Sequence, residues 1–194
     1  MTTGKPLDQL ARIDVTLHCD MDGEGQALLR HLQRTRAMVR HHWPPPERIG
    51  EGADLVLCEY GPGLSQRLGW APGEASAALI VLLPQQARID LSELSAACPD
   101  AVLHRPYQPQ AIDVALMSAL DHFGFGKRAR QRIERMEENI HAMRDIERAK
   151  HQIMAKNQVS EAKAFQVLRD LAMQRRMTVA AVAAKLVDSI DIPS

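Results

Sequence analysis

The sequence predicts an α/β domain followed by an all-α segment, in which a doubly wound parallel sheet is succeeded by a coiled-coil helix and a bundle of three helices. Over residues 12–120, short runs rich in Val, Leu and Ile alternate with segments of helical period, which indicates a parallel sheet covered by helices. Residues 129–143 then place apolar side chains at alternating steps of four and three, the spacing of a coiled-coil seam. Residues 148–194 contain two further capped helices with apolar faces.

Length and charge limit how the chain can be organised. Its 194 residues suit one large domain or two small ones, each able to bury a core. Lys plus Arg and Asp plus Glu both number 24, so the formal net charge is zero. Any affinity for nucleic acid must therefore come from a local patch of cations.

The cysteines and the apolar runs indicate a cytoplasmic protein. Cys19, Cys58 and Cys98 are single, widely spaced and set among apolar residues, so we expect three reduced core thiols. No apolar run has the length of a signal sequence or of a membrane span. We therefore expect no association with a membrane.

The elements of the sheet follow from the alternating pattern. The predicted strands are 13–19, 37–40, 54–58, 78–83 and 101–104. The predicted helices between and after them are 25–35, 64–68, 91–97 and 109–123. This alternation resembles the receiver domain of response regulators, which has five strands and five helices. Four of the helices are placed here, and the third helix of the pattern is poorly marked.

The resemblance implies a receiver whose phosphorylation site is degenerate. In receivers an Asp ending the third strand accepts phosphate, acids after the first strand hold Mg²⁺, and a Lys before Pro at the fifth strand senses charge. In this sequence Glu59 stands at the end of the third strand, Asp20 follows the first strand, and Arg105 precedes the proline at the fifth strand. The extra methylene of Glu59 displaces its carboxylate, and a planar guanidinium does not act as a compact point charge. We predict a pseudo-receiver domain, residues 1–123, that is not phosphorylated.

Two arrangements are open for Glu59. It could form a permanent ion pair with Arg105 that imitates the charge pattern of a phosphorylated receiver. It could instead be a solvated acid at the end of its strand. We favour the solvated acid, because Coulomb attraction is weak where water enters.

The string from Asp20 to Gly25 supplies an alternative with enzymatic activity. Asp20-Met21-Asp22-Gly23 is similar to the DxDG motif of haloacid-dehalogenase-type phosphatases, in which the first Asp is the nucleophile. Glu24 replaces the usual Thr, and no later Lys with a downstream acidic pair is clearly placed. Asp and Gly are also common in any turn before a helix. We therefore expect no enzyme and no cofactor.

Two further features lie near the second strand. Three consecutive prolines in the string Trp-Pro-Pro-Pro-Glu, residues 43–47, predict a rigid extended connector, and Trp43 could either anchor this loop or contact a partner. His41 and His42 are adjacent, and neighbours on a strand point to opposite faces, so we expect no metal site.

A linker helix, residues 124–147, is predicted to form a parallel homodimer. The glycines of Phe123-Gly124-Phe125-Gly126 predict a bend or a stop at the end of the preceding helix, and hence a domain boundary. The alternative to a dimer is that this helix docks on its own receiver domain. The seam comprises Ala129, Ile133, Met136, Ile140 and Met143.

The helix is expected to continue to Asn157, which can adopt a left-handed conformation and end it. Ser160 is a good N-cap for a second helix to about residue 173, and Thr178 caps a third. The expected core side chains are Phe165, Leu168, Ala172, Val179, Val182, Ala183 and Leu186.

Seven residue pairs of this segment fall in the register of the ANTAR domain, the RNA-binding module of transcription antiterminators. These are Ala149-Lys150, Ile153-Met154, Ser160-Glu161, Ala164-Phe165, Leu168-Arg169, Ala172-Met173 and Val182-Ala183. With the degenerate receiver and the proline string, nearly the whole chain resembles the amidase-operon antitermination regulators of the AmiR/NasT family. The resemblance implies binding of leader-RNA hairpins and control by a ligand-sensing negative regulator protein.

In an ANTAR domain, residues 148–194, we expect cations to contact the RNA and a small Ala149 to let a phosphate backbone approach. The expected RNA-binding residues are Arg148, Ala149, Lys150, Lys156, Arg169, Arg175 and Arg176. Lys163 and Gln158 depart from the family, which usually has an acid and a Gly there. Aromatic stacking is expected to be scarce, since Phe165 is assigned to the core. The remaining alternative is a phosphorylated regulator that places its third helix in a DNA groove.

Overall fold

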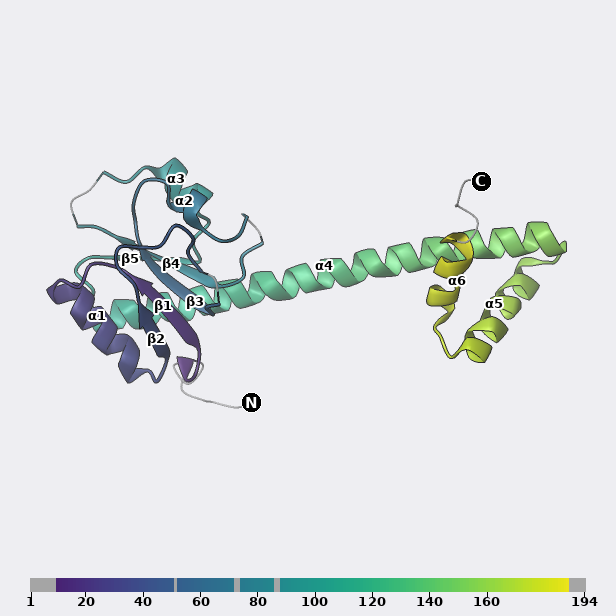
Figure 1. The fold of residues 1–194 in the computed structure, drawn as a ribbon, viewed down its shortest axis with the longest axis horizontal. Helices are drawn as coiled ribbons and strands as arrows, with labels where there is room; N and C mark the ends of the chain where they lie inside the picture. Colours follow the sequence, from purple (N-terminus) through teal and green to yellow (C-terminus); the bar gives the residue numbers. More distant parts are fainter. Residues whose placement is uncertain (1–9, 51, 72–73, 86–87, 189–194) are drawn as a thin grey trace. The chain divides into compact units, whose positions relative to one another are not determined.

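The computed structural model describes residues 10–50, 52–71, 74–85 and 88–188 (Figure 1). The chain divides into two compact units, Met1–Lys127 and Arg128–Ser194. Helix α4, Pro109–Asn157, contributes residues to both units. Among the residues that the structure covers, no helix is both long enough and apolar enough to cross a membrane.

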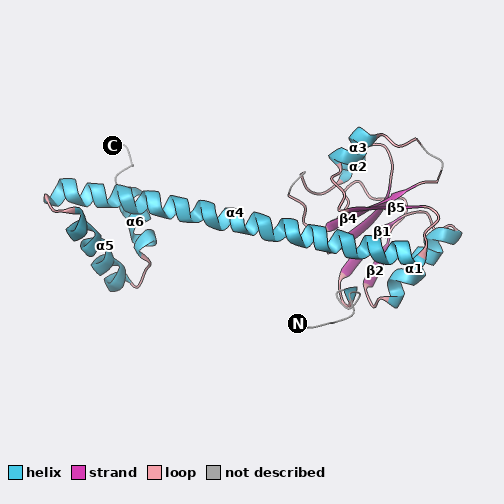
Figure 2. Ribbon diagram, turned by 180° about the vertical axis from the view of Figure 1, so that it is seen from behind, coloured by secondary structure: helices cyan, strands magenta, loops and turns pink. Residues whose placement is uncertain are grey.

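The N-terminal unit is built on the predicted five-stranded parallel sheet. Its strands are β1 Asp14–His18, β2 Met38–His41, β3 Leu55–Glu59, β4 Ala78–Leu83 and β5 Ala101–His104. They lie in the order β2-β1-β3-β4-β5, and every neighbouring pair is parallel (Figure 2). The carboxyl ends of β1, β3 and β5 therefore meet at one edge of the sheet, where ligands bind in open α/β folds.

Helices cover both faces of this sheet. Alternate residues of β3 and β4 point to opposite faces, so each strand supplies two apolar cores. The first core packs the sheet against α1 Gly23–Arg34 and the start of α4. The second packs it against α2 Leu64–Arg67 and α3 Leu91–Ala96. The doubly wound class predicted from the sequence is thus confirmed.

The connection from β2 to β3 differs from the expected five-helix pattern. Of its described residues, 42–50 and 52–54, none is helical. Arg67 reaches over from α2 and donates hydrogen bonds to the carbonyl oxygens of Pro45, at 2.5 Å, and Pro46, at 2.8 Å. Prolines have no backbone donors, so a helix is not available here and the carbonyls are satisfied by a side chain instead. Trp43 is 44% exposed, whereas Arg67 makes two hydrogen bonds to the string.

The three thiols are free, and two of them lie in the core. Burial raises the pKa of Cys19 and of Cys58 to about 12. Cys98 is exposed, which corrects the expectation of a third core thiol. It follows the short helix α3 with a φ of 47°, a turn position at the surface rather than a position on a packed face.

Helix α4 corrects the expected interruption at residues 123–126. It passes through Gly124 and Gly126 without a break and ends, as predicted, at Asn157. A glycine inside a helix costs only about 1 kcal/mol relative to alanine, which continued hydrogen bonding on both sides can offset. The left-handed conformation after the helix is adopted by Gln158, with φ 51°, rather than by Asn157.

The C-terminal unit is the predicted three-helix bundle. Helices α5, Glu161–Arg175, and α6, Val179–Asp188, follow α4 in the sequence. The hydroxyl of Ser160 accepts the amide of Lys163 and that of Thr178 accepts the amide of Ala181, so both expected caps are present. The buried core comprises Ala149, Leu168, Ala172, Val182, Ala183 and Val187.

Phe165 corrects the expected core, because it is 44% exposed. The buried side of α5 is formed by Ala164, Leu168 and Ala172, which recur every four residues. At about 100° per residue, Phe165 lies about 60° around the helix from Leu168. Helices α5 and α6 approach each other closely, and Phe165 lies outside the buried side of α5.

Candidate functional site

A cluster of charged side chains occupies the carboxyl edge of the sheet. Arg105 follows β5, Glu59 ends β3, and Asp22 precedes α1. The guanidinium of Arg105 donates from Nη2 to Glu59 Oε1 at 3.1 Å and from Nη1 to Asp22 Oδ2. The arginine fork therefore joins two carboxylates that come from distant parts of the sequence.

The pair between Glu59 and Arg105 is formed, so the solvated Glu59 that we favoured is wrong. The side chains are only 18% and 14% exposed. Attraction is stronger there than in open water, and a planar fork can satisfy two acceptors at once. Glu59 Oε2 also accepts the backbone N–H of Asp20 at 3.4 Å, so both of its oxygens are engaged.

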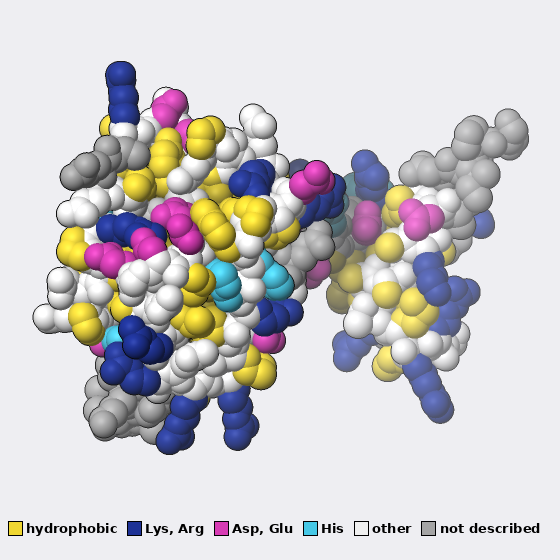
Figure 3. Space-filling model, turned by 60° about the vertical axis from the view of Figure 1, so that its left-hand side comes forward, with side chains coloured by type: hydrophobic (Ala, Val, Ile, Leu, Met, Phe, Trp, Pro, Cys, Tyr) yellow, Lys and Arg dark blue, Asp and Glu magenta, His cyan; other side chains and the backbone are white. Residues whose placement is uncertain are grey.

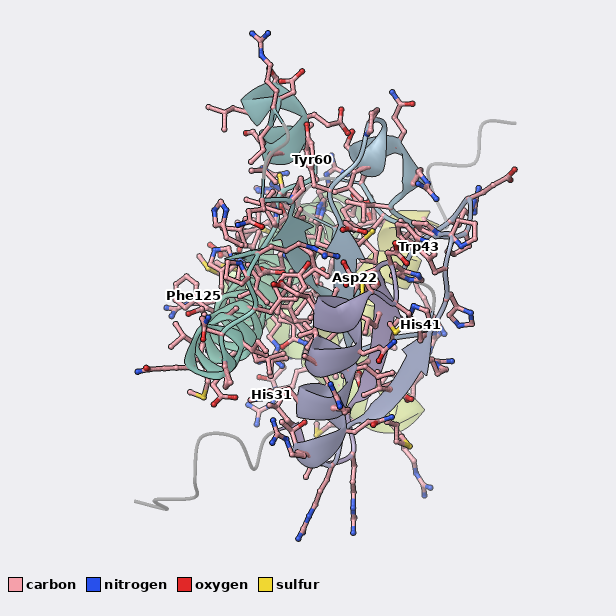
Figure 4. All side chains as sticks on the ribbon, turned by 90° about the vertical axis from the view of Figure 1, so that its left-hand side faces the viewer. Asp22, His31, His41, Trp43, Tyr60 and Phe125 are labelled. Carbon is pink, nitrogen blue, oxygen red and sulfur yellow. The ribbon has the colours of Figure 1, made fainter. Side chains whose placement is uncertain are left out.

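Asp22 belongs to this cluster, although the sequence comparison with receivers did not select it. Its Oδ1 accepts the amides of Gly25 at 2.8 Å and Glu24 at 3.1 Å, which makes it the N-cap of α1 (Figure 4). The hydrogen bond from the Gly25 amide is the main cause that lowers the pKa of Asp22 below its ordinary value. The hydrogen bond from Arg105 is the second largest cause. An Asp before Gly at a helix start is a capping signal that could have identified it.

The DxDG string is accounted for by helix capping and close packing. The carboxylate of Asp22, the second Asp of this motif, accepts hydrogen bonds from the Gly25 amide and from Arg105. A Cβ on Gly25 would lie 2.0 Å from the backbone oxygen of Asp20, so only glycine fits. Asp20 itself is exposed, and it joins the cluster through its backbone.

Tyr107 completes the cluster. Its hydroxyl accepts Arg105 Nε at 3.2 Å, and the guanidinium lies 5.2 Å from its ring centroid. Its amide donates to Glu24 Oε2 at 3.2 Å. Burial raises the pKa of Tyr107 to about 12. Burial disfavours the charged form of Arg105. The interactions with Asp22, Tyr107 and Glu59 outweigh this effect and raise the pKa of Arg105 above its ordinary value.

Three histidines lie where β1 and β2 end. His18 is 2% exposed, and its ring stacks on that of His42 with the centroids 6.0 Å apart. His41 Nε2 lies 2.9 Å from the carbonyl oxygen of Cys19. Burial is the main cause that lowers the pKa of His18. In the described ranges, no three His, Cys, Asp or Glu residues come together in a group that could hold a metal ion.

In the C-terminal unit, Ala149 does not occupy the position expected of an RNA contact. It is 0% exposed and lies in the core against Leu168 and Val182. Its methyl group is enclosed by the apolar cluster to which all three helices contribute. The prediction that its side chain lets a phosphate backbone approach is therefore wrong.

Lys150 is ion-paired within the unit. Its ammonium lies 2.5 Å from Glu161 Oε1 and 2.8 Å from Glu147 Oε1, and its side chain is 10% exposed. Hydrogen bonds raise the pKa of Lys150, with Glu147 as the largest cause and Glu161 as the second. Lys150 thus fastens the start of α5 to α4 instead of presenting a free cation.

The other five expected RNA-binding residues are exposed. They are Arg148, Lys156, Arg169, Arg175 and Arg176. On α5, Arg169 lies between two exposed apolar side chains, Phe165 at 44% and Met173 at 63%. Figure 3 shows Lys and Arg side chains around hydrophobic ones on the visible face of this unit.

A different part of the unit is acidic. An open groove of about 580 Å³ lies between α4 and α6, floored by alanines of α6. Four acids of α4 line its other side, together with His141: Glu134, Glu137, Glu138 and Asp145. Acidic side chains therefore line this groove, whereas exposed cationic side chains lie on α5.

The expected dimer seam is exposed along α4. Ile133, Met136, Ile140 and Met143 are between 48% and 68% exposed, and Ala129 is half-buried. Four large apolar side chains at seam spacing on one helix are what a partner helix would cover.

Comparison with known proteins agrees with both units. The family model "AmiR, N-terminal" matches residues 13–120, and the model of the ANTAR domain matches residues 134–187. The chain is similar to the aliphatic amidase regulator of Pseudomonas aeruginosa, with 25% identity over 191 residues and 96% of each sequence covered.

A solved structure titled as the response regulator StyR shares the fold. The TM-score is 0.51, with 92% of this chain and 100% of that chain covered. Sequence identity to it is 13%, so this likeness concerns the fold alone. The receiver-like sheet and the ANTAR helices predicted from the sequence are confirmed.

Proposed function

Since the chain belongs to the AmiR family, whose N-terminal model covers more than half of it, we propose that it is a transcription antitermination regulator that binds leader-RNA hairpins through its C-terminal unit. Bound hairpins would prevent a downstream terminator from forming. The observation that carries the proposal is the ANTAR match over residues 134–187, on a helical unit with exposed cations.

The electrostatics of the C-terminal unit support RNA rather than an uncharged ligand. Arg169, Arg175 and Arg176 are exposed along and just after α5, and Lys156 is exposed at the end of α4. Such cations neutralise phosphates and release counterions. Hairpin loops also expose unpaired bases, which a protein can contact without entering the deep major groove of an RNA duplex.

The test is a competition between nucleic acids. Full-length protein would be titrated with hairpins from the transcript upstream of its neighbouring genes and with duplex DNA of the same sequence, at about 50 mM and 200 mM salt. Preference for the hairpins at both salt concentrations supports the proposal. Preference for the duplex would favour the DNA-binding alternative.

The charged cluster supports control without phosphorylation. Both oxygens of Glu59 are engaged, and Arg105 is held by two carboxylates and Tyr107. A phosphoryl group would have to displace this network. We expect acetyl phosphate to leave both the mass and the oligomeric state of the protein unchanged, and a mass increase of one phosphoryl group would contradict this part of the proposal.

Control then falls to a ligand-sensing protein that holds the regulator inactive and releases it when inducer binds. The family resemblance implies such a partner. A pull-down from the native host, with and without small amides, tests it. Recovery of one partner that is lost when the amide is added is the expected result, and recovery of no partner under either condition contradicts it.

A parallel homodimer along α4 is the proposed assembly. With Ile133 and Ile140 at a positions, Arg132 falls at g and Glu137 at the following e position. In a parallel pair these two residues meet across the interface with opposite charges, twice per dimer. The register therefore provides both an apolar seam and a charge match for a second copy of the chain.

A further inference from the structure

We propose that the exposed side of α5 is a base-stacking surface, on which Phe165 stacks an unpaired base of an RNA loop while Arg169 neutralises the adjacent phosphate. This inference rests on the proposed RNA-binding function. It assigns the recognition of single-stranded RNA to α5, whereas the sequence placed the central contact at residues 149–150 of α4.

The exposure of Phe165 is a consequence of how the bundle packs. Ala164, Leu168 and Ala172 already fill the side of α5 that faces the core. Phe165 has 44% of its surface in solvent, and the two residues that follow at steps of four are Arg169 and Met173, both exposed. The three side chains therefore form one stripe with a cation between two apolar groups.

The charged side chains of α5 indicate what kind of ligand binds this stripe. The exposed cations of α5 and its C-cap are Lys163, Arg169, Arg175 and Arg176. Its acids are Glu161, which is paired with Lys150, and the half-buried Asp170. An anionic ligand with flat apolar groups fits such a surface, and single-stranded nucleic acid has both a phosphate backbone and bases with π-faces.

Two other parts of this unit are less suited to RNA than the α5 stripe. The α4–α6 groove is lined by four carboxylates, which repel phosphate. Ala149 is buried and Lys150 is ion-paired, so neither offers a contact without rearrangement. On α5, the stripe places exposed apolar and cationic side chains next to one another.

The experiment uses the full chain and a pool of hairpin RNAs with one fixed stem and a randomised loop. Hairpins enriched by the wild-type protein are titrated against Phe165→Leu, which keeps an apolar side chain but removes the ring, and against Phe165→Tyr, which keeps the ring. We expect Phe165→Leu to weaken binding about five- to hundredfold, and Phe165→Tyr to retain it. Arg169→Gln should weaken binding and reduce its salt dependence by about one phosphate contact.

The matched control is Gln174→Leu, an exposed position on the opposite side of α5, which should bind as the wild type does. Thermal melts should be unchanged for Phe165→Leu, because the residue is outside the core. A fluorescent adenine analogue in the loop should lose emission on binding to wild type but not to Phe165→Leu.

The possible failures are distinguishable. If wild type enriches hairpins and Phe165→Leu binds them equally well, the stacking inference is overturned while RNA binding stands. If wild type enriches no hairpin, the proposed function fails and this inference with it. If Phe165→Leu leaves RNA binding intact but changes the oligomeric state by light scattering, the stripe contacts protein, and the inference is again overturned.

Discussion

Replacing Ala149 with leucine distinguishes a core residue from an RNA contact. Ala149 is 0% exposed, and four of the seven buried apolar residues in the described part of its unit are alanines. The Ala149 side chain is therefore enclosed by neighbouring apolar groups, and a leucine would place three further carbons among them. The variant Ala149→Leu should destabilise the C-terminal unit and leave the N-terminal unit unaffected.

The magnitude follows from the packing. Overpacking a filled core costs about 1–3 kcal/mol. A helical unit of roughly 60 residues has a total stability of about 3–9 kcal/mol. The substitution thus removes a large share of it and should lower the melting temperature of the unit by about 5–20 °C.

The chain provides separate signals for its two units. Both tryptophans, Trp43 and Trp70, lie in the N-terminal unit, so their fluorescence reports on the sheet domain. Helical circular dichroism reports mainly on α4, α5 and α6. Urea titrations followed by both signals should show an earlier helical transition in the variant and an unchanged fluorescence transition.

The matched control is Ala155→Leu, the same exchange at an exposed position of the same helix, which should change stability by less than about 0.5 kcal/mol. The reasoning is refuted if Ala149→Leu keeps wild-type stability but loses hairpin binding. That result would mean that Ala149 is accessible to RNA and that the bundle opens on binding.

Three further predictions concern the sheet domain and the seam. Arg105→Ala leaves the poorly exposed Glu59 without its partner and should lower the stability reported by tryptophan fluorescence by about 1–3 kcal/mol; the exposed Arg40→Ala should change it by less than about 0.5 kcal/mol. Because burial holds the pKa of His18 below 6.5, the folded state binds fewer protons than the unfolded chain. Stability should therefore fall as the pH drops below 6.5, and His18→Gln should show a smaller fall in urea titrations across that range; an identical pH dependence would contradict this. Ile140→Asp places a charge in the seam and should make the protein monomeric in light scattering. The control His141→Asp, next to the seam, should leave the protein dimeric. A dimeric Ile140→Asp protein would show that the seam is not the dimer interface.

The cluster at the sheet edge suggests what a degenerate receiver retains. Arg105, Glu59 and Asp22 join the ends of β5 and β3 to the start of α1. Side chains thus connect these three elements without a phosphoryl group.

The sequence by itself determined the elements and their class. The short apolar runs of β3 and β4, rich in Val, Leu and Ile, are typical of buried strands. The steps of four and three after residue 129 are typical of a helix with one apolar stripe. The caps Ser160 and Thr178 marked the start of α5 and α6. These are local properties, because they depend on period and on hydrogen bonds within one turn.

Only the tertiary structure decided which side chains meet and which face water. Asp22, Glu59 and Arg105 are separated by dozens of residues, and their contact depends on the strand order β2-β1-β3-β4-β5. Phe165 and Ala149 carried the same helical pattern as their neighbours, yet one is exposed and the other buried. Periodicity shows that a helix has an apolar side, but the width of that side is set by how closely the neighbouring helices approach, and that distance depends on residues far away in the chain.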